Sequence, residues 1–128
     1  MNKDNVLAVA DAIEKHSIPK LGFNMCVFGA KADSAFADRT DKSGHGCGTV
    51  ACIAGTARTL RTGRIFLIRV SRFRWSKEAD WLGLDENDAN ELFFAAAANI
   101  DLEDIEPAQA VAVLRHLAET GKVDWSVA

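Results

Sequence analysis

The sequence lacks any long hydrophobic run: in its 128 residues, no apolar stretch approaches the roughly 20 residues that a membrane-spanning helix requires. Residues 1–4 also lack the charged and then apolar layout that opens a signal peptide. We therefore expect a cytoplasmic protein that does not associate with membranes. The three cysteines are an odd number without a framework spacing, which argues against a disulfide-stabilised scaffold.

The chain also lacks internal repeats and low-complexity segments, so we expect one compact domain over residues 1–128. Apolar residues make up 48% of the sequence and charged residues 26%, as is usual for globular proteins. Apolar positions recur mostly at helical spacing, which predicts a mainly α-helical fold of about five helices with at most a small two-stranded β element. Helices are expected from Asp4 to near His16, from Thr49 to Gly63, from Ser76 to Leu82, from Asp85 to about Ala96 and from Pro107 to Gly121. A strand is expected at 65–71, and a short strand or a buried extended segment within 21–29.

The segment 44–57 combines a glycine-rich loop, two cysteines, a histidine and a run of small side chains. Cys47 lies just before the helix predicted to begin at Thr49. Backbone amides and the helix dipole at such a position lower the pKa of a thiol and favour the thiolate. Cysteine hydrolases use this placement, and Cys47-Gly48 at a helix start is weakly similar to papain-like enzymes. Cys47 is therefore a candidate nucleophile.

A catalytic cysteine also needs a base that accepts its proton. His45 is the nearest histidine along the chain, although it is uncomfortably close in sequence for that role. His16 and His116 become candidates only if the fold brings one of them near the thiol.

The same segment holds potential metal ligands in His45, Cys47 and Cys52, with Cys26 as a possible fourth from outside it. Zinc usually takes four ligands in pairs that are separated by two to four residues, and this spacing fits that pattern poorly. We therefore expect Cys52 to be a small core residue and the protein to use no cofactor. The alternating glycines 44, 46 and 48 suit an anion before a helix, but the lysine of a P-loop is missing.

Charge is unevenly distributed along the second half of the chain. The stretch from Arg58 to Lys77 contains seven basic residues and no acidic one, whereas residues 78–128 contain twelve acidic residues and two basic ones. The plainest interpretation is that the two regions pair within the chain or across a dimer. An external partner is the alternative, and the residues expected to contact it are Arg69, Arg72 and Arg74.

The run from Cys47 to Ala57 resembles a motif of small uncharacterised proteins from bacteria and their phages. In that family, Cys-Gly-Thr, two small residues, Cys, an apolar residue and Ala-Gly precede an aromatic residue and an alanine. Thr56 stands here in place of the aromatic residue. Looser similarity continues through Leu82-Gly83-Leu84, the stretch from Ala89 to Phe93, and Gly121 to Trp125. The resemblance implies a bacterial or phage origin and carries no known activity.

These patterns predict a non-enzymatic accessory protein that binds another protein or a second copy of itself. The reasons are the polarised charge, the long loop over residues 30–48 and the lack of a complete catalytic constellation. One alternative is a thiol-dependent hydrolase or transferase with Cys47 as nucleophile at a helix N-terminus. A second alternative is a nucleic-acid-binding protein that uses the basic stretch from Arg58 to Lys77.

Overall fold

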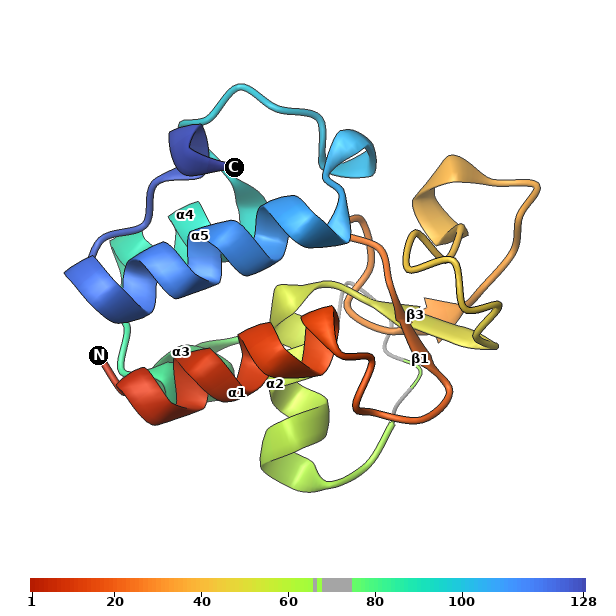
Figure 1. Ribbon diagram of the computed structural model, residues 1–128, viewed down its shortest axis with the longest axis horizontal. Helices are drawn as coiled ribbons and strands as arrows, with labels where there is room; N and C mark the ends of the chain where they lie inside the picture. The colour runs from red at the N-terminus through yellow and green to blue at the C-terminus, as the bar shows by residue number, and fades with distance from the viewer. Residues whose placement is uncertain (66, 68–74) are drawn as a thin grey trace.

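The computed structural model of the chain describes residues 1–65, 67 and 75–128. These residues form five α-helices and one small sheet, which confirms the predicted mainly α-helical architecture. Figure 1 shows α1 and α5 side by side, with the strands gathered near one end of the helices. The helices are α1 (Lys3–Glu14), α2 (Ile53–Thr62), α3 (Ser76–Leu82), α4 (Glu86–Phe94) and α5 (Pro107–Thr120), the strands are β1 (Leu21–Phe23), β2 (Ala30–Lys31) and β3 (Thr49–Ala51), and short 3₁₀ turns lie at Ala37–Arg39, Leu102–Asp104 and Trp125–Val127.

Capping residues explain several helix boundaries. Asp85 caps α4 because its side chain accepts a hydrogen bond from the backbone N–H of Asp88. Pro107 begins α5, where a missing N–H costs nothing. Gly83 and Gly121 end α3 and α5 in the left-handed conformation that glycine adopts easily. All four of these boundaries agree with the sequence prediction.

Packing between α1 and α5 forms the largest contact between two helices of the described chain. Val6 and Val9 of α1 are completely buried, as are Val113, Leu114 and Leu117 of α5. Burying a side chain of this kind stabilises the fold by about 1.5–3 kcal/mol. This packing fixes the position of α1, and hence of the residues that follow its C-terminal end.

The prediction that a helix begins at Thr49 is wrong. Residues Thr49–Ala51 form β3, the central strand of the sheet, which pairs in parallel with β1 and antiparallel with β2. The β-branched Thr49 and Val50 suit a strand, and Val50 is completely buried. Helix α2 begins only at Ile53, after Cys52 as its N-cap. Pairing on both sides of β3 therefore outweighed the helical pattern of small residues.

One detail of the sheet differs from the prediction, since it has three strands instead of two. The short strand expected within 21–29 is confirmed as β1, and the helix expected from Ser76 to Leu82 is confirmed as α3. The expected strand at 65–71 falls almost entirely on residues outside the described part of the chain.

A close contact explains the glycine inside α2. A Cβ atom at Gly55 would overlap the backbone carbonyl oxygen of Phe28, so only glycine allows the helix to approach that segment. An interior glycine costs a helix about 1 kcal/mol relative to alanine, and this close approach explains why the cost is tolerated.

Candidate functional site

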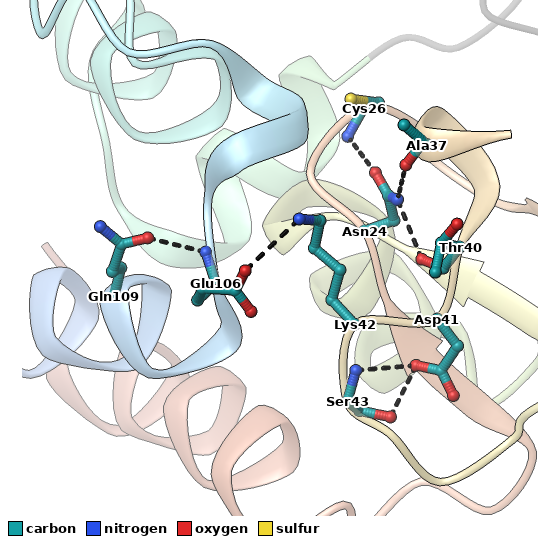
Figure 2. A network of polar contacts seen from close by, with 9 residues as sticks. All are labelled: Asn24, Cys26, Ala37, Thr40, Asp41, Lys42, Ser43, Glu106 and Gln109. Atoms are coloured by element: carbon teal, nitrogen blue, oxygen red, sulfur yellow. Dashed lines mark hydrogen bonds and ion pairs between the residues drawn. The ribbon is translucent and has the colours of Figure 1, made fainter. Parts of the chain in front are cut away.

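The loop of residues 41–48 is organised by the carboxylate of Asp41. Its Oδ1 accepts hydrogen bonds from the backbone N–H of Phe23 at 3.2 Å and from the backbone N–H and hydroxyl of Ser43 at 3.0 and 2.6 Å. Its Oδ2 accepts a hydrogen bond from the backbone N–H of Cys47 at 2.9 Å. Figure 2 shows Asp41 turned toward Ser43. One carboxylate thus joins the strand β1 to both ends of the loop that carries Cys47.

The contact between Asp41 and β1 requires a glycine in the strand. A Cβ atom at Gly22 would overlap the carboxylate of Asp41. Burial opposes ionisation of this carboxyl group, but the hydrogen bonds from Ser43, Cys47 and Phe23 outweigh it and lower the pKa of Asp41. The group is therefore a carboxylate at neutral pH.

The loop is also attached to the helical layer. The ammonium group of Lys42 forms an ion pair with Glu106 at 3.4 Å, immediately before α5 begins (Figure 2). Asn24 lies completely buried beside the loop, and its side-chain amide donates to the carbonyl groups of Ala37 and Thr40. These contacts hold the preceding turn against the sheet.

His16 reaches this loop from the C-terminal end of α1. Its Nε2 lies 2.9 Å from the Sγ of Cys47, which is hydrogen-bond distance. His16 has a φ of +49°, a left-handed conformation that is uncommon outside glycine and in which histidine is enriched. The helix ends at Glu14 with Lys15 as its C-cap, so the turn at His16 carries the ring toward the loop.

His45 stacks on His16, with ring centroids 4.1 Å apart and an angle of 15° between the ring planes. His45 is otherwise exposed, whereas His16 and Cys47 are partly buried. The structure therefore brings together two of the three histidines and one cysteine. Both residues that the sequence suggested for catalysis contact His16. Cys47 does so through its sulfur, and His45 through its stacked ring.

The electrostatics of Cys47 differ from those expected at a helix N-terminus. The residue precedes the strand β3, and the amides at the start of α2 lie instead near Cys52. Burial raises the pKa of the Cys47 thiol, the negative charge and hydrogen bonding of Asp41 raise it further, and hydrogen bonding with Ser43 opposes them. Cys47 therefore holds its proton at neutral pH, so a base must remove it when the sulfur reacts.

The other two cysteines have different surroundings. Cys52 is 1% exposed, accepts a hydrogen bond from the N–H of Gly55 at 3.4 Å, and has its pKa raised to about 11 mainly by burial. Burial also raises the pKa of Cys26, with Asp38 adding to the effect. Neither environment favours a thiolate.

Within residues 1–65, 67 and 75–128, there is no group of three or more histidine, cysteine, aspartate or glutamate residues suited to hold a metal ion. The candidate ligands His45, Cys47 and Cys52 are divided between the exposed loop and the core. The candidate interaction residues Arg69, Arg72 and Arg74 lie outside the described residues. None of the helices described in the structure has the length and apolar character needed to cross a membrane.

The sequence did not point to Asp41 or Ser43, and it left undecided whether His16 lies near the thiol of Cys47. The Asp-x-Ser-Gly order at 41–44 is a signal that could have indicated the first two, because aspartate and serine side chains commonly bond to backbone N–H groups two residues on. The position of His16 depends on how α1 packs against the rest of the chain, which no local pattern indicates.

No family model matches this chain, and comparisons with curated proteins and with solved structures likewise give no match.

Proposed function

We propose that Cys47 and His16 form the nucleophile–base pair of a thiol-dependent acyl hydrolase or acyltransferase. The observation that carries this proposal is the 2.9 Å separation between Cys47 Sγ and His16 Nε2, which is the contact that proton transfer between them requires. When the His16 proton is on Nδ1, Nε2 is free to accept the S–H of Cys47.

The reaction begins when Cys47 transfers its proton to His16 as the sulfur attacks the carbonyl carbon of an ester or amide. The tetrahedral intermediate expels the alcohol or amine, which takes the proton from His16, and a thioester remains on Cys47. Water or another nucleophile then attacks the thioester and gives its proton to His16. The departing Cys47 thiolate takes this proton back, which restores the starting state.

Asp41 and His45 position the pair. Asp41 holds the backbone N–H of Cys47 and so fixes the loop that carries the sulfur. His45 covers one face of the His16 ring and limits its rotation. Precise orientation of this kind supplies a large part of the rate in enzymes that form covalent intermediates.

The experiment that tests the proposal is acylation by p-nitrophenyl acetate, followed by release of p-nitrophenol and by peptide mass spectrometry. We expect one acetyl group per chain, located on Cys47, and loss of the acetylation in Cys47→Ala. The matched control is Cys26→Ala, which removes another partly exposed thiol and should acylate like the wild type. Acetylation of Cys26 and Cys47 at equal rates would contradict the proposal, because it would show ordinary thiol reactivity.

Binding of a protein or nucleic-acid partner by the basic stretch 58–77, which was inferred from its charge, stays a prediction. Among the basic residues of the stretch 58–77, Arg61 forms an ion pair at 2.8 Å with Glu78, whose side chain is completely buried. This pair supports charge neutralisation within the chain at that position. The resemblance of residues 47–57 to small bacterial and phage proteins likewise stays a prediction, and it agrees with the proposal in placing Cys47 within the motif.

A further inference from the structure

A hollow of about 300 Å³ lies between α1, α5 and the loop of residues 41–48. We propose that it binds the aliphatic chain of the acyl group that is transferred to Cys47, an inference that rests on the proposed function. Its lining combines residues of α1 (Ile13 and Glu14), of the loop (Ser43 and His45) and of α5 (Pro107, Ala108 and Val111).

The walls of the hollow are suited to a hydrocarbon chain. Ile13, Pro107, Ala108 and Val111 supply apolar surface from two helices that pack against one another. The volume lies at the lower end of the range of about 300–1,000 Å³ that is usual for small-molecule sites. A short aliphatic chain would remove this apolar surface from water, which is the main driving force for binding such a group.

The charges near the hollow are already paired, which favours an uncharged occupant. Glu14 accepts a hydrogen bond from the guanidinium group of Arg115 at 3.0 Å. Glu106, which directly precedes Pro107, pairs with Lys42 at 3.4 Å. A charged ligand would have to compete with these pairs, whereas an acyl chain would not.

His45 connects the hollow to the reactive pair. It lines the hollow and also stacks on the ring of His16, whose Nε2 contacts Cys47. The reacting carbonyl carbon must meet Cys47, so the rest of the acyl group has to extend past His45 to reach the apolar walls. An acetyl group has only a methyl group beyond the carbonyl carbon, whereas a hexanoyl group extends four carbons further.

The test compares p-nitrophenyl acetate with p-nitrophenyl hexanoate as acylating agents of Cys47. Each rate is divided by the rate of the same ester with free N-acetylcysteine, which removes differences in intrinsic reactivity. We expect the normalised rate to be about tenfold higher for hexanoate. Complete burial of its four additional methylene groups would allow a larger preference, so this value corresponds to partial burial.

Filling the hollow supplies the decisive variant. Ala108 is exposed near the start of α5, so Ala108→Trp adds volume to the hollow without disturbing the core. We expect its hexanoate-to-acetate ratio to fall to about one, and a smaller decrease in Ala108→Leu. The matched control is Glu119→Trp, which places the same side chain at an exposed position near the other end of α5 and should keep the wild-type ratio.

The outcomes separate this inference from the proposed function. If neither ester acylates Cys47, both the proposed function and the acyl site are wrong. If acetate and hexanoate acylate Cys47 with equal normalised rates, or if Ala108→Trp keeps the preference for hexanoate, only the acyl site is wrong. A preference for hexanoate that Ala108→Trp abolishes and Glu119→Trp retains would support the acyl site.

Discussion

At the scale of single residues, the site depends on how charge and hydrogen bonding act on one thiol. Asp41 fixes the loop through the N–H of Cys47 and also raises the pKa of the Cys47 thiol through its negative charge. Hydrogen bonding with Ser43 acts in the opposite direction. In the proposed mechanism, the thiol is kept neutral until His16 takes its proton, in contrast to enzymes that hold a stable thiolate.

Because Asp41 and Ser43 affect the pKa of the Cys47 thiol in opposite directions, replacing each of them should shift this pKa in opposite directions. Asp41→Asn removes a negative charge, so the pKa of Cys47 should fall. Alkylation of Cys47 by iodoacetamide should then become fast at a lower pH than in the wild type. Ser43→Ala removes a hydrogen bond that favours the thiolate, so the same alkylation should become fast only at a higher pH. The measurement is the alkylation rate of Cys47 against pH, followed by mass spectrometry.

Shifts in the same direction for Asp41→Asn and Ser43→Ala would contradict this account, because they would indicate a general disturbance of the loop. Ser126→Ala is a suitable control, since Ser126 bonds to Asp124 at the other end of the chain. It should leave the alkylation profile of Cys47 unchanged.

The stacking of His45 on His16 gives a second prediction. His45→Ala removes the ring that covers His16 and should slow acylation of Cys47 about tenfold, because a less oriented base transfers the proton less often in a productive geometry. His45→Phe keeps an aromatic ring at this position and should restore most of the rate. Stopped-flow acylation with p-nitrophenyl acetate measures both. If His45→Phe is as slow as His45→Ala, the imidazole itself is required and stacking is not the role of His45.

At the scale of secondary-structure elements, close approach between segments determines how the site is supported. Helix α2 contacts the backbone of Phe28 through Gly55, and the N–H of Cys52 donates to the carbonyl group of Val27 at 2.8 Å. The segment after β1 is thereby held against the start of α2. Strand β1 carries Phe23 at one end of the Asp41 network, and Cys47 at the other end lies two residues before the neighbouring strand β3.

Gly55→Ala tests this support. The added methyl group would overlap the carbonyl oxygen of Phe28, so we expect a loss of about 1–3 kcal/mol in the free energy of unfolding, measured by urea denaturation. The matched control is Gly48→Ala, because a Cβ atom there meets no atom within 4 Å and the φ of Gly48 is not positive. Equal stability of the wild type and Gly55→Ala would show that α2 does not pack against this carbonyl group.

Local sequence patterns were sufficient to predict the boundaries of some helices, but they were insufficient to predict the strand β3. Asp85, Pro107 and the terminal glycines of α3 and α5 are signals that act within one helical turn, and they predicted the boundaries correctly. Thr49–Ala51 was predicted as the start of a helix because small residues follow it, although Thr49 and Val50 are β-branched and suit a strand. Pairing with β1 and β2, which lie far from this segment in sequence, makes it the central strand of the sheet.

At the scale of the whole molecule, the site depends on contacts between distant parts of the chain. The sulfur and the ring that it contacts are 31 positions apart, and the packing of α1 against α5 determines where that ring lies. The cysteine was a candidate from the sequence, but for a reason that the structure corrects, because it precedes a strand and not a helix. Its partner could not be predicted, since only the fold shows which of His16, His45 and His116 lies at the sulfur.

The central claim is that His16 is the base for Cys47, and it is tested most directly by the rate at which p-nitrophenyl acetate acylates Cys47 in two histidine variants. His16→Asn removes the base and keeps a residue that tolerates the left-handed backbone of this position. His116→Asn changes a histidine on α5 that is not part of the pair. We predict a rate about 100-fold lower in His16→Asn, as is typical for loss of a general base, and an unchanged rate in His116→Asn. Equal acylation rates in the wild type and His16→Asn would contradict the account.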